Sequence, residues 1–171
     1  MRSLALIRHA RAAADPSDDH ARPLDPQGES EAGALAEWLA GRGKPLDLLL
    51  ASSATRARQT AERLSAAWTP SVTIAPDDEL YLASAARVLS RLQEVDDVAS
   101  AVGVVCHSPG VVDLVRTLTV SGDRDALRDL GNGMGTAGCA VLSLELDRWR
   151  DLAPAVAHLE AFARPRVEAK G

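Results

Sequence analysis

Two histidines and two arginines of the sequence follow runs of apolar residues. The first apolar run of the chain stops at Arg8 and His9, a later run stops at His107, and Arg56 follows a third. An arginine can grip phosphoryl oxygens with two parallel hydrogen bonds, and a neutral imidazole has a lone pair that can attack phosphorus. Together, these residue types predict metal-independent phosphoryl transfer through a phosphohistidine intermediate.

Short apolar runs alternate with amphipathic segments along the chain. Such alternation predicts an α/β fold with a single-domain, doubly wound, mainly parallel sheet and helices on both faces. We expect strands at 3–7, 46–51, 72–74, 101–106, 139–146 and 157–162, and helices at 28–39, 54–68, 84–94 and 111–120. A loop is expected at 12–26, long enough to cover a site, and another at 131–138.

Three of these strands place polar side chains at their carboxyl ends, where ligands bind in open α/β sheets. The first delivers Arg8 and His9, the second Ser52 and Ser53, and the fourth His107 and Ser108. Arg8 and His9 taken alone fit two solvated residues at a strand end. If the three strands are neighbours, however, all of these groups and Arg56 meet in one cleft, with Ser108 among the residues that bind substrate.

Composition limits the class of protein. The 171 residues fit one domain, which we place at 1–165, followed by a charged tail at 166–171. The net charge of −5 and the aromatic fraction of 3% argue against binding of nucleic acid or of anionic membranes. The first apolar run is too short for a signal peptide or a membrane-spanning helix, so a cytoplasmic location is expected.

No metal or cofactor site is predicted. Cys106 and Cys139 lie in separate apolar runs without ligand spacing, and His20 and His158 are predicted surface residues. The glycine-rich segment 131–135 precedes a predicted strand, whereas a nucleotide-binding loop opens a helix. The expected partner is a phosphorylated substrate, either a phosphoprotein or a small phosphate ester.

Three blocks of the sequence resemble the histidine phosphatase superfamily, whose members have the phosphoglycerate mutase-like fold. They are Leu6-Ile7-Arg8-His9-Ala10, then 52–61 with its Ser, Arg-Ala and Gln-Thr-Ala, then Cys106-His107-Ser108-Pro109-Gly110. Together the blocks span residues 4 to about 120. The resemblance implies that His9 is the phosphorylated nucleophile, that Arg8 and Arg56 bind phosphate, and that His107 is the second catalytic histidine.

The short chain and one further block resemble the small branch of the superfamily that contains the phosphohistidine phosphatase SixA. That block runs from Asp19 to Leu24 and is followed by Gly28. The resemblance implies that Arg22 adds to the phosphate pocket or holds the loop in place.

The sequence departs from the phosphoglycerate mutase branch at the usual acidic residue, which is Leu82 here. The carboxylates left to protonate a leaving group are Asp19, in the long loop, and Glu79, of which we favour Asp19. Cys106 also stands where glycine is usual in the family.

Three functions remain open on the sequence. The first is a SixA-like phosphatase that acts on phosphohistidine in proteins, and the second is a phosphatase of a small phosphorylated metabolite or nucleotide. The third is a module that binds phosphate or a phosphoprotein without turnover. Binding alone does not need a nucleophile, so the presence of both His9 and His107 argues against the third.

Overall fold

The protein has a seven-stranded sheet with the strand order β3-β2-β4-β1-β6-β7-β5. The computed structural model describes residues 1–15, 17–43 and 45–165, so the predicted tail 166–171 lies outside the described residues. The strands are β1 (Arg2–Arg8), β2 (Leu48–Ser52), β3 (Thr73–Asp77), β4 (Ala101–Cys106), β5 (Thr119–Gly122), β6 (Cys139–Leu144) and β7 (Ala157–Ala163). The helices are α1 (Pro26–Ala40), α2 (Thr55–Ser65), α3 (Ala85–Gln93), α4 (Gly110–Leu118) and α5 (Arg124–Gly131), with short 3-10 turns at Asp78–Leu80 and Trp149–Asp151.

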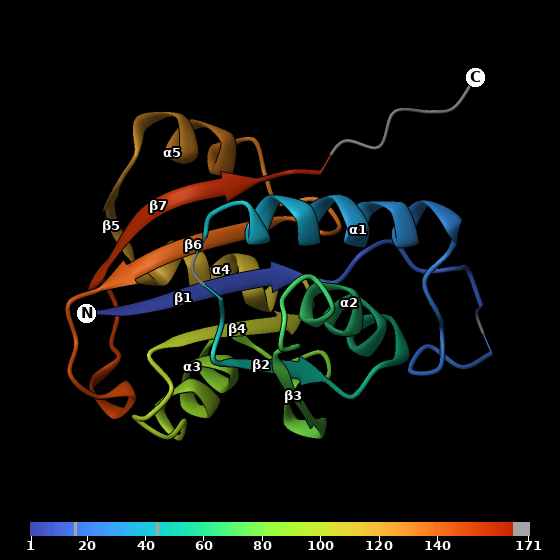
Figure 1. Cartoon of the computed structure of the whole chain (residues 1–171), viewed down its shortest axis with the longest axis horizontal. Helices are drawn as coiled ribbons and strands as arrows, with labels where there is room; N and C mark the ends of the chain where they lie inside the picture. Colours follow the sequence, from blue (N-terminus) through green and yellow to red (C-terminus); the bar gives the residue numbers. More distant parts are fainter. Residues whose placement is uncertain (16, 44, 166–171) are drawn as a thin grey trace.

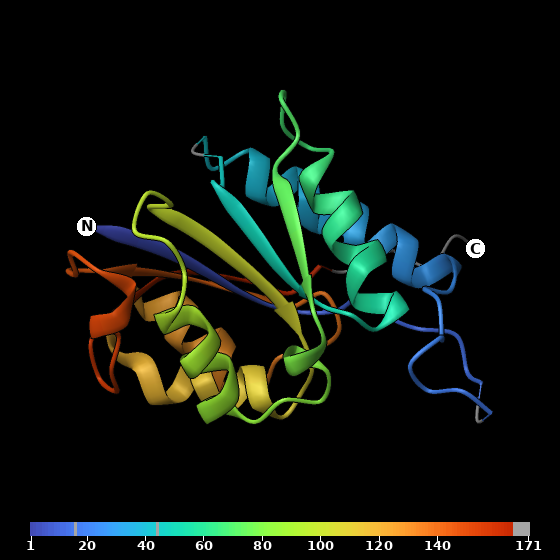
Figure 2. The ribbon, with the colours of Figure 1, turned by 90° about the horizontal axis from the view of Figure 1, so that it is seen from below.

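Helices cover both faces of the sheet, as predicted. Figures 1 and 2 show α1 and α2 on one side and α3, α4 and α5 on the other. Successive side chains of a strand point to opposite faces, so β1 contributes to two hydrophobic layers. Leu4 and Leu6 pack in the layer under α3 to α5, whereas Ala5 and Ile7 pack in the layer under α1 and α2. Burial on both faces explains why these strands read as continuous apolar runs.

The sheet is mainly parallel. β1 pairs in parallel with β4, β4 with β2, and β2 with β3, so the three strands that carry the candidate residues are neighbours. β6 runs antiparallel to both β1 and β7. The carboxyl ends of β1, β2 and β4 therefore meet at one edge of the sheet (Figure 1).

The segment after β4 differs from the sequence expectation. The helix predicted at 111–120 ends at Leu118, because Thr119 turns extended and opens the edge strand β5. The following helix α5 was not predicted, because it is only eight residues long, is mostly polar and buries only Ala126 and Leu130. Its one sequence signal is the cap at Asp123, whose side chain accepts hydrogen bonds from the next turn.

The strand β3 also runs further than the predicted 72–74, because it includes Pro76 and Asp77. A proline lacks the N–H that a central strand needs, but β3 lies at the edge of the sheet, where this donor is not required. The extension matters for the site because it carries the chain to Leu80 and Tyr81, beside the end of β2.

The described ranges contain neither a membrane-spanning helix nor a metal-binding cluster. No helix there is long and apolar enough to cross a membrane. Those residues also contain no group of three or more His, Cys, Asp or Glu side chains placed to hold a metal ion.

Candidate active site

The site lies at the carboxyl edge of the sheet, where three neighbouring strands end. His9 follows β1, Ser52 ends β2, His107 follows β4, and Arg56 lies in the first turn of α2. The backbone N–H of His9 donates to the Cys106 carbonyl at 3.0 Å, which ties the ends of β1 and β4 together. Arg8 is the last residue of β1, so the structure brings Arg8, His9, Arg56 and His107, the four residues that the sequence singled out, to this edge.

Arg56 stands between the two histidines. Its Nε–H donates to His9 Nε2 at 3.3 Å, and its Nη2 lies 3.4 Å from His107 Nδ1. The centroids of the two imidazole rings are 5.1 Å apart. Only 2% of Arg56 is exposed, so solvent screens its charge less than that of a surface arginine.

The hydrogen bonds of His9 set which of its ring nitrogens is free. Nδ1 lies 2.8 Å from the Ala10 carbonyl, which can only accept, so Nδ1 carries the proton. The lone pair of the neutral ring is then on Nε2, the atom that faces Arg56. Because burial disfavours the charged ring and Arg56 and Arg8 add positive charge, the pKa of His9 falls to about 4.

His107 is oriented in the same way by its neighbours. Its Nε2 lies 2.7 Å from Ser52 Oγ, and its Nδ1 faces the Arg56 guanidinium, which can only donate. In the neutral ring, Nε2–H therefore donates to Ser52 and Nδ1 holds the lone pair. Burial, with the charges of His9 and Arg56, lowers the pKa of His107 to about 3.

These two pKa values predict the pH behaviour of the unliganded protein. His9 and His107 should stay neutral well below pH 6.5, and two-dimensional ¹H–¹⁵N NMR of their ring nitrogens should show titration only near pH 4 and below. Between pH 6.5 and 4 the unfolded chain binds protons that the folded chain does not, so the free energy of unfolding should fall as the pH falls through this window. Midpoints near 6.5 for both rings contradict the prediction.

Arg8 lines the same cleft and has an unused donor. Its Nη1 donates to the Met134 carbonyl at 3.0 Å, whereas its buried Nε–H has no hydrogen-bond partner among the described residues. A buried donor left unpaired costs free energy, and an anion in the cleft can accept from it. Burial also lowers the pKa of Arg8.

The cleft has a volume of about 480 Å³ and is strongly basic. Among the described residues that line it are four arginines and one aspartate; they are Arg8, Arg11, Arg22, Arg56 and Asp19. Ser108, also predicted as a substrate-binding residue, lies exposed on its wall. Although the whole chain is acidic, this cleft is therefore suited to an anion.

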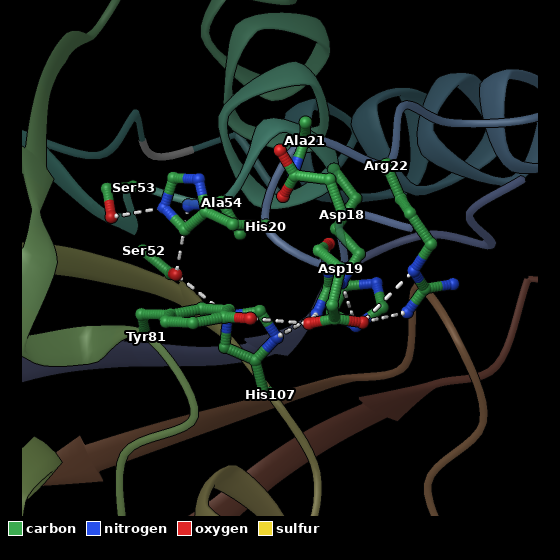
Figure 3. Close-up of polar contacts among 12 residues, drawn as sticks. Asp18, Asp19, His20, Ala21, Arg22, Ser52, Ser53, Ala54, Tyr81 and His107 are labelled. Carbon is green, nitrogen blue, oxygen red and sulfur yellow. Dashed lines mark hydrogen bonds and ion pairs between the residues drawn. The ribbon is translucent and has the colours of Figure 1, made fainter. Parts of the chain in front are cut away.

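The long loop after β1 brings Asp19 to the cleft (Figure 3). One oxygen of its carboxylate accepts from Arg22 at 2.8 Å, and the other accepts from Arg56 at 3.2 Å and from the Tyr81 hydroxyl at 2.5 Å. These donors lower the pKa of Asp19 well below its usual range, with Tyr81 contributing most. The carboxylate is therefore ionised in the unliganded protein.

Arg22 holds this loop in place as well as lining the cleft. Besides its bonds to Asp19, its Nη1 donates to the Ala13 carbonyl at 3.2 Å. Arg56 also binds the loop, because its Nη1 donates to the Asp19 carbonyl at 2.6 Å. Glu79, the other predicted acid candidate, forms a surface ion pair with Arg87 at 3.1 Å and is not among the described lining residues.

Sequence reasoning missed an aromatic contact in the site. The Tyr81 ring packs edge-on against both His107 and His20, with centroids 5.6 and 4.8 Å away. His20 is exposed, as predicted, but it belongs to this cluster and lies 2.9 Å from Ser53 Oγ (Figure 3). The sequence offered one signal for Tyr81, which is its position. Tyr81 follows the predicted strand at 72–74, and this strand lies beside the one that precedes Ser53.

Residues of α2 support the segment that carries the nucleophile. Thr60 Oγ1 accepts from the Ala10 N–H at 3.0 Å and donates to the Arg56 carbonyl at 2.7 Å. Gln59 Oε1 accepts from the Leu24 N–H at 2.8 Å and so holds the end of the long loop. The Gln-Thr pair of the second sequence block thus holds in place the backbone around the catalytic candidates and does not itself supply one.

Helix α1 supports the same segment from the other side. Buried Glu31 accepts from the Arg11 N–H at 2.9 Å. Gly28 is required here, because a methyl group built on it would lie 1.9 Å from the Arg11 carbonyl oxygen. The backbone after His9 is therefore fixed on both sides.

Comparisons with known proteins agree with this geometry. Residues 4–81 match the sequence profile of the histidine phosphatase superfamily (branch 1). An uncharacterized protein of Mycobacterium tuberculosis is 34% identical over 163 residues, which cover 94% of this chain and 100% of that protein. Phosphohistidine phosphatase SixA of Escherichia coli is 34% identical over 93 residues, 54% of this chain and 50% of SixA.

Solved structures extend the similarity to the whole chain. A Nakamurella multipartitia protein assigned as phosphohistidine phosphatase SixA is 34% identical with a TM-score of 0.81, and the match covers 97% of each chain. The structure of the protein histidine phosphatase SixA complexed with tungstate is 26% identical with a TM-score of 0.68, covering 83% of this chain and 88% of that one. With two histidines and two arginines at the carboxyl edge of such a sheet, the chain belongs to the histidine phosphatase superfamily, in its SixA-like branch, and is a phosphatase.

Proposed function

We propose that this phosphatase works through a phosphohistidine intermediate on His9 and that its substrate is phosphohistidine in proteins. In the first step Nε2 of His9 forms a bond to phosphorus while the bond from phosphorus to the leaving group breaks. In the second step water attacks phosphorus, the bond to Nε2 breaks, and inorganic phosphate leaves. No metal takes part in either step.

The orientation of His9 is the observation that carries this proposal. Its Nδ1–H is held by the Ala10 carbonyl at 2.8 Å, so the lone pair is on Nε2 and points into the cleft beside Arg56. The lowered pKa keeps this nitrogen unprotonated at neutral pH. A neutral, oriented imidazole is what attack on phosphorus requires.

The surrounding cations are placed to bind the phosphoryl oxygens. Arg8 has an unpaired Nε–H, and Arg56 lies between the two histidines. A phosphate dianion raises the pKa of nearby His107, so its Nδ1 can take up a proton and donate to a phosphoryl oxygen. Binding of tungstate, another oxyanion, by the related SixA supports this use of the cleft.

Asp19 is the proposed group for proton transfer. In the unliganded protein it is an ionised carboxylate held by Arg56, Arg22 and Tyr81. When a phosphate dianion binds Arg56 in place of the Asp19 carboxylate, the pKa of Asp19 rises. The carboxyl group can then hold a proton for the leaving group. In the second step the carboxylate can accept the proton of the attacking water.

A protein substrate is favoured by the accessibility of the site. Asp19 is 49% exposed and Arg22 is 26% exposed, so a side chain presented by another protein can reach the cleft. The imidazole of phosphohistidine is also a leaving group that needs little acid assistance. A small phosphorylated metabolite or nucleotide is the second candidate, and a binding module without turnover is the third.

Covalent trapping with a substrate panel tests the proposal. The protein is mixed with ³²P-labelled phosphohistidine on a carrier protein, with phosphoserine peptide and with p-nitrophenyl phosphate, and is denatured in alkali after milliseconds. We expect acid-labile, alkali-stable label on His9 and the highest kcat/KM for the phosphohistidine protein. Turnover without label on His9 contradicts the intermediate, a higher kcat/KM for the small esters contradicts the protein substrate, and binding without turnover supports the module.

A further inference from the structure

Leu82 is the one large apolar side chain among the described residues that line the catalytic cleft. The other lining residues are charged, polar or alanine. Leu82 is 60% exposed, so most of its apolar surface faces solvent at the mouth of the cleft and not the core. Single exposed leucines are common on surfaces, but this one lies in a basic anion site.

The backbone holds Leu82 in an unfavourable conformation. Its φ is +50°, in the left-handed region where a side chain costs about 1 kcal/mol or more and where glycine or asparagine is the usual choice. Strained residues of this kind persist where the surrounding structure fixes them, and they concentrate at functional sites. A buried contact does not explain the leucine, since its side chain packs in neither hydrophobic layer.

The residues on both sides of Leu82 are fixed. Leu80 is fully buried, and the Tyr81 hydroxyl donates to Asp19 at 2.5 Å. On the other side the Ala83 carbonyl packs against the start of α4 so closely that a methyl group built on Gly110 would lie 1.9 Å from its oxygen. The position of Leu82 beside the cleft is therefore set by its neighbours.

The chemistry of the cleft divides between its floor and its mouth. Arg8, His9 and Arg56 form the basic floor, where a phosphoryl group is bound. Attack by His9 expels the leaving group from the opposite side of phosphorus, toward solvent. An apolar side chain at the mouth can gain free energy there by covering an apolar surface of the leaving group.

We propose that Leu82 is a specificity-determining residue that packs on the leaving group, and that the group it selects is a flat ring such as the imidazole of phosphohistidine. This inference rests on the proposed function, because it assumes phosphoryl transfer at His9. A leaving group such as ammonia or a polyhydroxylated sugar offers Leu82 little apolar surface. Burial of apolar surface against Leu82 would by itself favour a leaving group with a flat ring over ammonia or a sugar.

Two substrates with the same type of scissile bond isolate the contribution of the leaving-group ring to kcat/KM. N-phosphoimidazole and phosphoramidate both have a P–N bond, but the first releases imidazole and the second ammonia. We expect Leu82→Ala to lower the ratio of kcat/KM for phosphoimidazole to kcat/KM for phosphoramidate about fivefold, from the loss of a partial apolar contact. The ratio cancels general damage to phosphoryl transfer, and the melting temperature reports the fold.

Two further variants serve as controls. Val98→Ala removes an exposed apolar side chain in the turn before β4, at the opposite edge of the sheet, and should leave the ratio unchanged. Leu82→Gly also relieves the backbone strain, so it should lower the ratio as Leu82→Ala does if the side chain is responsible. A ratio within about 1.5-fold of wild type in both Leu82 variants overturns the inference, and so does a wild-type protein that dephosphorylates a phosphohistidine protein but cleaves neither compound. Failure of the wild-type protein on all three substrates overturns the proposed function instead.

Discussion

His9→Ala is expected to lower kcat for p-nitrophenyl phosphate by at least about a thousandfold. The substitution removes Nε2, the atom that we propose forms the bond to phosphorus, while the anion site around it remains. The expected residual rate is that of water attack on a bound phosphate. Steady-state release of p-nitrophenolate measures the loss.

The same variant should remain folded and should still bind phosphate. The His9 ring donates to the carbonyl of its neighbour Ala10 and accepts from Arg56, and the variant keeps the backbone hydrogen bond to Cys106, so the melting temperature should stay within about 5 °C of wild type. Inorganic phosphate should bind in isothermal titration calorimetry, because Arg8 and Arg56 are intact. His158→Ala is the matched control, since His158 is exposed and its ring bonds Ser121, outside the cleft. Full activity in His9→Ala refutes the assignment of the nucleophile.

The centre of the fold could be predicted because its strands are buried on both faces. β1, β2 and β4 read as uninterrupted apolar runs that end at polar residues, and those ends fixed the place of the site. The direction of β6 could not be read, since a strand has the same hydropathy pattern in either direction. β5 and α5 were missed because both are short, since β5 has four residues with none buried and α5 has eight with two buried.

The residues at the strand ends of the cleft could be predicted from the sequence, whereas the contact between Asp19 and Tyr81 could not. Arg8, His9 and His107 adjoin strand ends, so sheet topology alone brings them together. Asp19 and Tyr81 are 62 positions apart, and they meet only because the long loop folds back over the end of β2. That path depends on bonds from Arg56 and Gln59 to the loop backbone, which no hydropathy pattern encodes.

One buried side chain, Arg56, links the titratable groups of the cleft. Arg56 contacts both histidines and also binds Asp19 through its carbonyl and its carboxylate. These contacts use Nε, Nη1 and Nη2, so the planar guanidinium is engaged on three sides. A compact ammonium group cannot reproduce this geometry, even though it has the same charge.

Arg56→Lys should therefore lower kcat/KM for p-nitrophenyl phosphate by about a hundredfold or more, or about 2.7 kcal/mol of transition-state stabilisation. The loss should appear in both kcat and KM, because a phosphoryl group would lose bidentate binding and the loop at Asp19 would lose its anchor. Arg58→Lys is the matched control: it makes the same change two residues further along α2, at an exposed position, and should keep kcat/KM within about twofold of wild type. If kcat/KM of Arg56→Lys stays within threefold of wild type, the charge of Arg56 alone explains its role and the planar geometry of the guanidinium does not matter.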